Sequence, residues 1–250
     1  MSKFHFTTVL SGEYIYKFLV MYETLKYHCK DFMLFSMCAD EESYKILKEL
    51  QLNSVEPLYI EDIYSDQLEK ARRNRSNLEF CWTLKPITLD YVMEYYRDAE
   101  YYAHLDADLV FFAAPDVIFD EAPEAELYLV DHNNSKRFQH TYHTSGRFNT
   151  GFVGCRNSKE ARKAVGWWRN KCLEACPSKA DPVKKLYGDQ RYVERWLELF
   201  EKVHIVKNKG VNVAIWNIEG LDISLRDQRV YVNDDLLVFY HFSGLIALDA

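Results

Sequence analysis

The first part of the chain alternates short apolar runs with longer segments in which apolar residues recur every three or four positions. Residues 4–10, 31–37 and 55–60 are apolar runs of strand length, whereas residues 13–28 and 41–50 have helical spacing. This strand–helix order is typical of a largely parallel sheet with helices on both faces. The pattern therefore predicts an α/β fold.

Residues 100–112 read as a buried strand that two carboxylates, Asp106 and Asp108, interrupt. In a strand, residues i and i+2 point the same way, so both carboxylates would converge while Ala107 turns away. Two acids held together in an apolar run repel each other, and a divalent cation such as Mg²⁺ or Mn²⁺ removes that cost. Such pairs also occur at solvated strand ends and in turns, so the spacing leaves both interpretations open.

Lys85 is the one cation in an apolar, aromatic stretch that leads into a helix ending near residue 96. Pro86 suits the first turn of a helix, which would put Lys85 at a helix start. Helix starts in parallel sheets gather at the carboxyl ends of strands, where ligands bind. Lys85 is therefore either a ligand contact or a surface lysine whose stem covers apolar residues.

Residues 148–155 form a predicted strand in which the polar Asn149 and Thr150 precede Gly151. Glycine inside a strand often marks the close approach of a ligand or of another backbone. Residues 157–175 follow with helical spacing, and their apolar stripe is assigned to the core.

Asp189 and Gln190 open a further predicted helix, in which Leu197 belongs to the apolar side. Asp is a common N-cap, so Asp189 has a structural interpretation as well as a functional one. Residues 236–242 form the last predicted strand. His241 lies near its end, where a histidine is more often structural.

Two polar segments carry groups that could bind ligands. Residues 65–77 are interpreted as a solvated helix face, with phosphate binding as the alternative, and residues 132–146 as a loop without a diagnostic metal spacing. The groups concerned are Arg72, Arg73 and Arg75 in the first segment and His132, His140 and His143 in the second.

Composition narrows the function classes. The 250 residues carry 31 basic and 38 acidic side chains, and the net charge of −7 argues against a general nucleic-acid binder. The six cysteines form no CxxC pair, which suits reduced thiols in a cytoplasmic protein. We expect no membrane span, since no apolar run approaches about 18 residues. Association with the inner face of a membrane stays open.

An ordered series of short segments runs through nearly the whole chain, and it resembles the GT-A-type nucleotide-sugar glycosyltransferases. The resemblance is strongest to family 8, the group of glycogenin and the bacterial lipooligosaccharide galactosyltransferases, in an uncharacterised bacterial branch. It implies a single Rossmann-like domain with a mixed, mainly parallel sheet, comprising a nucleotide-binding lobe (1–112) and an acceptor-side lobe (113–250). The segments are Thr7-Thr8-Val-Leu with Tyr14, Leu84-Lys85, Leu105-Asp106-Ala-Asp108, Phe148-Asn149-Thr150-Gly151, Gly188-Asp189-Gln190 and His241-Phe-Ser-Gly244.

The resemblance also implies roles for single residues. Asp106 and Asp108 would bind Mn²⁺ or Mg²⁺, with His241 as the third protein ligand. The donor would be a nucleoside-diphosphate sugar, most often UDP-linked, and the acceptor a glycan or glycolipid in polysaccharide or cell-envelope synthesis. Retention of anomeric configuration is implied as well. On the donor side would lie Thr8, Tyr14, Lys85, Asp106 and Gly244, and on the sugar and acceptor side Asn149, Asp189 and Gln190.

One segment departs from the family pattern. Family 8 members usually continue past the His-x-x-Gly segment with a Lys-Pro-Trp-like stretch, whereas Gly244 is followed here by Leu-Ile-Ala-Leu-Asp-Ala. A second cation for the diphosphate is therefore missing at that place. A substitute such as Lys209, a truncated chain or weak turnover would each account for it.

Two other functions fit parts of the pattern. Phosphatases of the haloacid dehalogenase type also use Asp-x-Asp after an apolar strand, with the first Asp as nucleophile. In that class the motif normally lies near the N-terminus and precedes Gly-Thr, whereas Leu109-Val110 follows Asp108 here. A non-catalytic carbohydrate-binding protein is the other alternative, since an aromatic content of 15% could serve sugar stacking.

Overall fold

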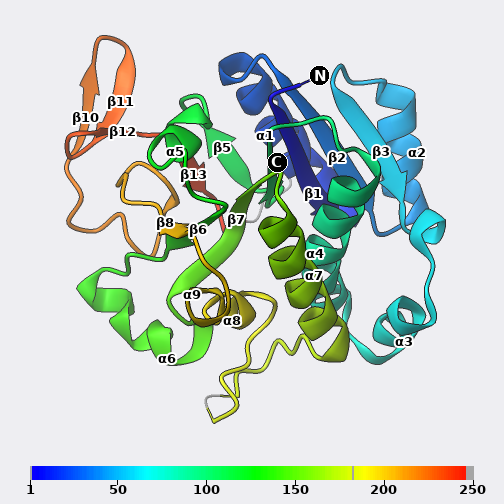
Figure 1. Ribbon diagram of the computed structural model, residues 1–250. Helices are drawn as coiled ribbons and strands as arrows, with labels where there is room; N and C mark the ends of the chain where they lie inside the picture. The colour runs from blue at the N-terminus through cyan, green and yellow to red at the C-terminus, as the bar shows by residue number, and fades with distance from the viewer. Residues whose placement is uncertain (1, 182, 246–250) are drawn as a thin grey trace.

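Seven strands form a mixed central sheet in the order β3-β2-β1-β4-β7-β6-β8 (Figure 1). The computed structural model describes residues 2–181 and 183–245. Strands β3, β2, β1 and β4 are parallel, β7 runs antiparallel to both β4 and β6, and β8 is parallel to β6. The predicted mixed, mainly parallel sheet is confirmed. Its strands are β1 (Phe4–Leu10), β2 (Phe32–Cys38), β3 (Val55–Tyr59), β4 (Tyr101–Leu105), β6 (Leu127–Asp131), β7 (Phe148–Arg156) and β8 (Val203–Ile205).

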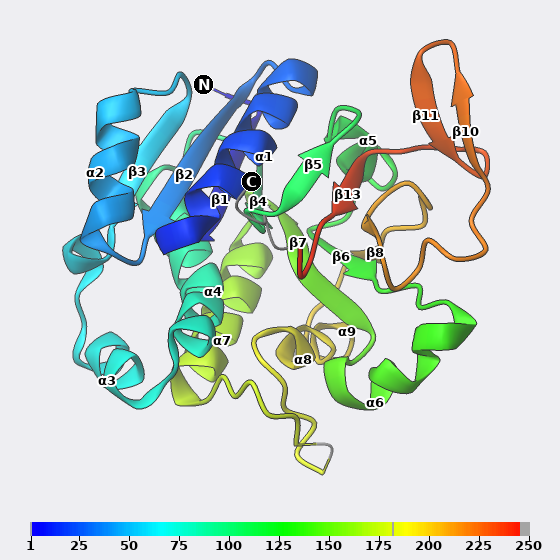
Figure 2. The ribbon, with the colours of Figure 1, turned by 180° about the vertical axis from the view of Figure 1, so that it is seen from behind.

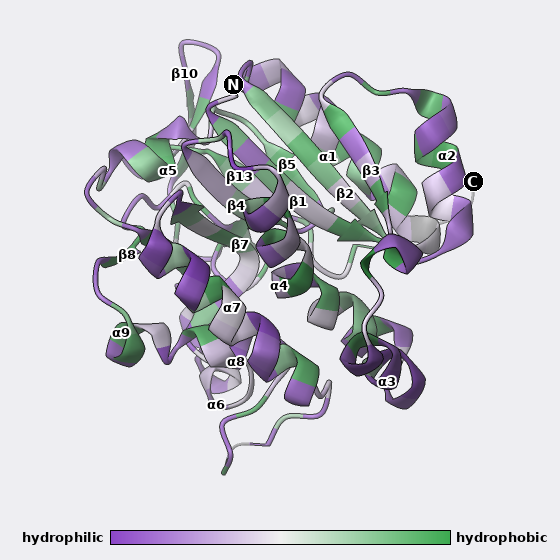
Figure 3. Cartoon of the chain, turned by 45° about the vertical axis from the view of Figure 1, so that its right-hand side comes forward, coloured by the Kyte–Doolittle hydropathy of each residue, from purple (hydrophilic) through white to green (hydrophobic). Residues whose placement is uncertain are grey.

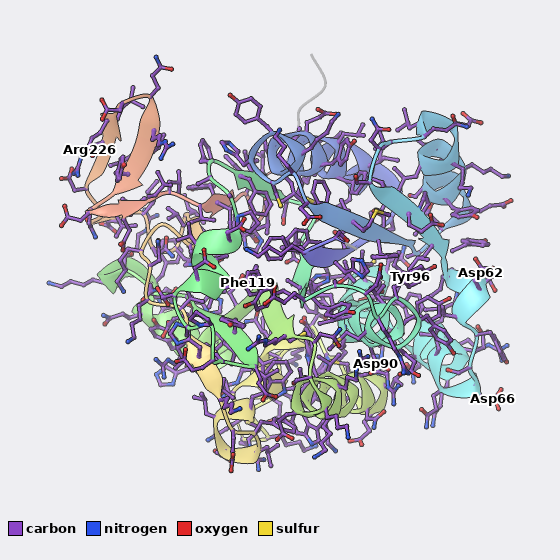
Figure 4. The ribbon with its side chains drawn as sticks, turned by 45° about the horizontal axis from the view of Figure 1, so that its top comes forward. Asp62, Asp66, Asp90, Tyr96, Phe119 and Arg226 are labelled. Carbon is purple, nitrogen blue, oxygen red and sulfur yellow. The ribbon has the colours of Figure 1, made fainter. Side chains whose placement is uncertain are left out.

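Helices cover both faces of this sheet (Figure 2). The neighbouring residues Leu34 and Phe35 of β2 enter two separate apolar cores, because successive strand residues point to opposite faces. Phe18 of α1 packs in the first core and Trp168 of α7 in the second. Phe119, which is fully buried, lies in the interior (Figure 4). The longer helices are α1 (Ile15–His28), α2 (Glu41–Leu50), α3 (Asp66–Asn74), α4 (Asn77–Tyr95) and α7 (Lys159–Glu174).

Helix α3 is hydrophilic along most of its length, which agrees with the predicted solvated face (Figure 3). Among the described residues, no helix is both long and apolar enough to cross a membrane.

The remaining elements of the fold are short. The short elements are η1 (Gly12–Tyr14), η2 (Ile60–Ile63), α5 (Asp116–Asp120), η3 (Lys136–Thr141), α6 (Tyr142–Ser145), α8 (Gln190–Val193), α9 (Trp196–Leu199), β5 (Leu109–Phe111), β9 (Val213–Ala214), β10 (Ile223–Arg226), β11 (Arg229–Val232), β12 (Asp235–Leu236) and β13 (Phe239–His241).

Helix α4 begins earlier than predicted, so Pro86 lies inside it and Lys85 is not at a helix start. Ser76 and Glu79 form a capping box that starts the helix at Asn77. An internal proline costs about 3 kcal/mol because it removes a hydrogen bond. Burial of the surrounding apolar side chains offsets that cost, since Leu84 is fully buried.

The predicted strand over residues 100–112 is also wrong in its middle. Strand β4 ends at Leu105, and Asp106 to Asp108 form a turn closed by a 3.3 Å hydrogen bond from the Leu109 N–H to the Asp106 carbonyl. Strand β5 then joins a separate sheet of order β5-β13-β9. The two carboxylates therefore converge because the chain turns at the end of the sheet, and not because of strand alternation.

Two predictions in the second half need correction. The helix expected after Gly188 is two short helices, α8 and α9, and Leu197 is 44% exposed where it was assigned to the apolar side. The last predicted strand is divided into β12 and β13. Strands β10 and β11 form a hairpin that carries Arg226 away from the central sheet (Figures 1 and 4). The division into lobes at residue 112 stays a prediction.

Glu79 connects two segments that are distant in the sequence. Its Oε1 accepts hydrogen bonds from the Ser178 N–H at 2.7 Å and from the Ser178 hydroxyl at 2.9 Å. Its Oε2 accepts one from the Ser76 N–H at 3.0 Å. These bonds, the one from the Ser178 N–H most of all, lower the Glu79 pKa to about 2.

We expect the contribution of Glu79 to the free energy of unfolding to depend on pH. Because its native-state pKa is lowered, the stabilisation is present above the ordinary pKa of 4.5 and is lost as pH falls through about 2. Glu79→Ala should lower the free energy of unfolding by about 1 kcal/mol at pH 7, as measured by urea titration. The exposed Glu49→Ala is the control, and an equal loss for Glu79→Ala at pH 2 and pH 7 would contradict a role for the carboxylate.

Candidate functional site

A cleft of about 590 Å³ opens where β1 and β4 end, and it collects most of the predicted site residues. The turn after β4 contributes Asp106 and Asp108, and α4 contributes Lys85 from its middle. The start of β7, the start of α8 and the end of β13 supply further polar groups. These groups are Asn149 and Thr150 from β7, Asp189 and Gln190 from α8 and its N-cap, and His241, Ser243 and Gly244 from β13 and the chain beyond it.

Asp106, Asp108 and His241 come together although they lie far apart in the sequence. One ligand atom from each lies within 4.8 Å of the others. His241 Nε2 is 3.1 Å from Asp108 Oδ1 and 3.8 Å from Asp106 Oδ2. The register of the β5–β13 pair explains this, because it sets His241 opposite Leu109, directly after Asp108.

This cluster fits a divalent cation. Two carboxylate oxygens and one imidazole nitrogen are ligands that Mn²⁺ and Mg²⁺ accept, and three protein ligands leave positions for a substrate. Within residues 2–181 and 183–245, this is the only group of three or more acidic, histidine or cysteine side chains with that spacing. Asp106, Asp108 and His241 are therefore the residues that would hold the metal.

Asp106 also has two basic neighbours. Its Oδ1 is 2.6 Å from Lys85 Nζ and 3.0 Å from His104 Nε2. Burial alone would raise the Asp106 pKa, but Lys85 and His104 outweigh it and hold that pKa below its ordinary value. Burial likewise opposes the charge on Lys85, yet Asp106 and Asp189 raise the Lys85 pKa above its usual range. Both groups are therefore charged at neutral pH.

Asp189, unlike Asp106, forms no close ion pair among the described residues. It is buried, with an exposed fraction of 2%, and its Oδ2 has no hydrogen-bond partner among the described residues. Burial raises the Asp189 pKa, although the Lys85 ammonium and a hydrogen bond from Thr150 oppose that shift. Asp189 is also among the residues that line the cleft, so the charge of its carboxylate can stabilise positive charge on a bound group there.

Gln190, the neighbour of Asp189, uses its side-chain NH₂ group in a hydrogen bond to the protein. Its Nε2 donates to the Ser145 carbonyl at 2.5 Å. This bond holds the start of α8 against the end of α6, where Ser145 also lines the cleft. The Gln190 side-chain carbonyl oxygen has no hydrogen bond to the part of the chain that the structure describes, so it could accept one from a bound group.

Gly151 allows His241 to lie against β7. A Cβ atom at position 151 would be 2.5 Å from His241 Cε1 and 2.8 Å from Asn149 Oδ1, closer than side chains can pack. The sequence predicted a close approach at this glycine, and the group that approaches is the imidazole of His241.

We expect Gly151→Ala to displace His241 and to weaken Mn²⁺ binding by about tenfold or more, as for other changes that disturb ligand orientation. Isothermal titration with Mn²⁺ would measure this. Gly166→Ala is the matched control, because its new Cβ would meet only Asp90 Oδ1, at an ordinary 3.7 Å. Unchanged Mn²⁺ affinity in Gly151→Ala would contradict the assignment of His241 as a ligand.

Other predicted residues differ in their placement. Tyr14 and Gly244 line the cleft, and Tyr14 is 44% exposed. Thr8 is fully buried and does not line the cleft, and its Oγ1 has no hydrogen-bond partner among the described residues. Instead the next residues along the chain, 9–11, reach the cleft. Lys209 donates to Asn133 Oδ1 at 3.3 Å and is not among the lining residues.

The arginines and histidines of the two polar segments, residues 65–77 and 132–146, contribute little to the lining of the cleft. Among the histidines of residues 132–146, only His132 lines it. None of the three arginines of residues 65–77 does so; Arg72 and Arg73 pair with Glu61 and Glu69. Lys85 is thus the only Lys or Arg among the described lining residues. The Leu-Ile-Ala-Leu-Asp-Ala stretch lies outside the described residues, apart from its first residue, Leu245.

Sequence reasoning missed several site residues. His104 is fully buried and joins Asp106 to Thr7, whose Oγ1 is 3.4 Å from His104 Nδ1. The two-residue spacing of His104 and Asp106 was visible, but it gave no reason to link them. Trp216, which also lines the cleft, packs edge-on against His241 with ring centroids 5.2 Å apart.

Two bacterial proteins are similar to this chain in sequence. No protein-family model matches it. The Bacillus subtilis (strain 168) protein YfnD, described as uncharacterized, is 48% identical over 244 residues, which cover 98% of this chain and 78% of YfnD. YfnF of the same organism, also described as uncharacterized, is 30% identical over 246 residues, covering 96% of this chain and 80% of YfnF.

Solved structures with a similar fold are glycosyltransferases. The galactosyltransferase LgtC, solved with donor and acceptor sugar analogs, has a TM-score of 0.62 at 13% identity, covering 96% of this chain and 87% of LgtC. Mouse xyloside xylosyltransferase 1 has a TM-score of 0.57 at 15% identity, covering 96% of this chain and 98% of that protein. At these identities the likeness shows the fold. This chain therefore has the GT-A glycosyltransferase fold, and it belongs to the family of YfnD and YfnF.

Proposed function

We propose that this protein is a metal-dependent glycosyltransferase of the family 8 type, which moves a sugar from a nucleoside-diphosphate sugar to a glycan or glycolipid. The observation that carries the proposal is the convergence of Asp106, Asp108 and His241 beside Lys85 in one cleft. Carboxylates, an imidazole and a buried ammonium together suit a diphosphate held through a cation.

The chemistry follows from the charges that sugar transfer creates. A divalent cation held by Asp106, Asp108 and His241 would supply Lewis-acid stabilisation of the leaving diphosphate. Lys85 adds a fixed positive charge beside the same site and needs no proton transfer to act. No other Lys or Arg lines the described part of the cleft, so Lys85 would be the only such side chain there to neutralise the diphosphate.

Positive charge develops on the sugar ring as its bond to the diphosphate breaks, as in glycoside cleavage. Asp189 lines the cleft, and the negative charge of its carboxylate would stabilise this positive charge electrostatically. Gln190 would accept a hydrogen bond from a sugar or acceptor hydroxyl, and Tyr14, which lines the cleft, would contact the nucleotide base. Retention of anomeric configuration and a UDP-linked donor are part of the proposal. So is a cytoplasmic role in polysaccharide or envelope synthesis, including work at the inner membrane face.

Titration of UDP into the protein, with Mn²⁺ and then with EDTA, tests the donor site. We expect binding that requires the metal, followed by Mn²⁺-dependent release of UDP from one member of a panel of UDP-sugars. Failure to bind UDP, GDP and CDP with Mn²⁺ present would overturn the proposal.

The alternative functions give different results in the same experiments. In a haloacid dehalogenase-type phosphatase Asp106 would form an aspartyl-phosphate, but its carboxylate is already engaged by Lys85 and His104. Trapping of a phosphorylated Asp106 would favour that class. A non-catalytic carbohydrate-binding protein would bind glycans without nucleotide and release no UDP.

A further inference from the structure

The side-chain amide of Asn149 has only one orientation that fits its neighbours. Its Oδ1 accepts a hydrogen bond from the Gly151 N–H at 3.0 Å. A backbone N–H can only donate, so the atom that faces it must be the carbonyl oxygen and not the amide nitrogen. Asn149 is 8% exposed, and its surroundings in β7 keep it in this position.

The same oxygen decides which nitrogen of His241 carries a proton. Asn149 Oδ1 lies 3.2 Å from His241 Nδ1. Because that oxygen only accepts, Nδ1 must donate, and the neutral imidazole then has its lone pair on Nε2. The Trp216 ring, edge-on at 82° to the imidazole, restrains the ring from turning over.

His241 Nε2 in this tautomer faces two further acceptors. Asp108 Oδ1 is 3.1 Å away and Asp106 Oδ2 is 3.8 Å away. Three lone-pair groups therefore point at one another, and a cation placed among them converts their repulsion into ligation. The ligand set is arranged before any metal enters.

We infer that Asn149 is a positioning residue that fixes the Nδ1–H tautomer of His241 and so preforms the metal site. The inference rests on the proposed function only in that it concerns the same cation. It also limits what Asn149 can offer a substrate. Its oxygen is occupied twice, so only its NH₂ group is left for the cleft, and it can bind a sugar oxygen only as a donor.

Mn²⁺ alone, titrated calorimetrically, tests the positioning role. Asn149→Ala removes the acceptor and should weaken Mn²⁺ binding by about 10- to 100-fold, as is usual for residues that orient metal ligands. Asn149→Asp keeps an oxygen acceptor and should stay within about threefold of the original affinity or bind more tightly. Thr144→Ala changes a lining residue whose hydroxyl donates to the Thr141 carbonyl and not to His241, and it should leave the affinity unchanged.

Nitrogen-15 NMR of labelled histidine gives a readout that does not depend on activity. With Mg²⁺ as a diamagnetic probe, the His241 ring, assigned by its loss in His241→Ala, should have a protonated Nδ1 and an unprotonated Nε2. In Asn149→Ala that preference should diminish.

A protonated Nε2 in the Mg²⁺-loaded protein would overturn the inference, as would normal Mn²⁺ affinity in a folded Asn149→Ala variant. If Asn149→Ala does not fold, Asn149→Asp and the NMR spectrum of the unaltered protein still decide. Complete absence of Mn²⁺ binding to the unaltered protein would instead overturn the proposed metal site itself. The two failures are therefore distinguishable.

Discussion

Asp108→Asn is expected to abolish Mn²⁺-dependent UDP binding and sugar transfer while leaving the stability of the protein close to normal. Asp108 faces His241 and has no Lys or Arg within salt-bridge distance among the described residues, so its charge serves the proposed metal. A catalytic metal contributes several kcal/mol, so transfer should fall by about 10³-fold or more. Titration of UDP with Mn²⁺ and a UDP-release assay would measure both effects.

Asp106→Asn should behave differently, although it removes a ligand from the same cluster. Its carboxylate partners the buried Lys85 ammonium at 2.6 Å, and removing one member of a buried ion pair costs about 3–5 kcal/mol. Urea titration should therefore show a stability loss that Asp108→Asn lacks. Asp120→Asn, on the exposed end of α5, is the control for both the Asp108 and the Asp106 variants.

Full UDP binding by Asp108→Asn in the presence of Mn²⁺ would contradict the metal assignment.

Asp189→Asn is expected to lower kcat by about 10²- to 10³-fold, the usual cost of losing one charged or polar group that stabilises a transition state. The amide has nearly the same shape but no negative charge. Mn²⁺ affinity should change little, because Asp189 is not in the ligand cluster. Steady-state kinetics combined with Mn²⁺ titration would separate the two effects.

The pH dependence of kcat gives a second test of Asp189. Burial raises the Asp189 pKa, so this carboxylate ionises at a higher pH than an ordinary aspartate does. If its negative charge stabilises the sugar, kcat should fall as pH falls through that raised pKa, and Asp189→Asn should remove this limb. An acid limb that persists unchanged in the variant would assign the titration to another group.

Local patterns in the sequence and the family resemblance were sufficient to predict the class of fold and most of the predicted site residues that line the cleft. Strand β1 and helix α2 appear where apolar periodicity predicted them, since periodicity depends on neighbours a few residues apart. Lys85 and Asp106 stood out because a charged side chain in an apolar stretch is costly without a partner. Asp189 was singled out by its place at a helix start and by the family resemblance. The same reasoning could name these groups but could not pair them.

Helix boundaries and the fate of single residues depended on contacts across the molecule. Pro86 was expected to begin a helix, but burial around Leu84 and the capping box at Ser76 place it inside α4. Tertiary packing outweighs local preference at Pro86 because each preference is worth only a few kcal/mol. Thr8, which the resemblance put on the donor side, is fully buried, and residues 9–11 line the cleft.

The sequence by itself determined the α/β order of elements and the kinds of groups available for binding a metal and a diphosphate. Only the tertiary structure decided which groups meet: His241 with Asp108 through the β5–β13 register, and Asn149 with His241 across Gly151. The physical reason is that side-chain chemistry and periodicity are local properties. Asn149 and His241, which are 92 positions apart, are brought together by sheet pairing and by the absence of a single Cβ atom.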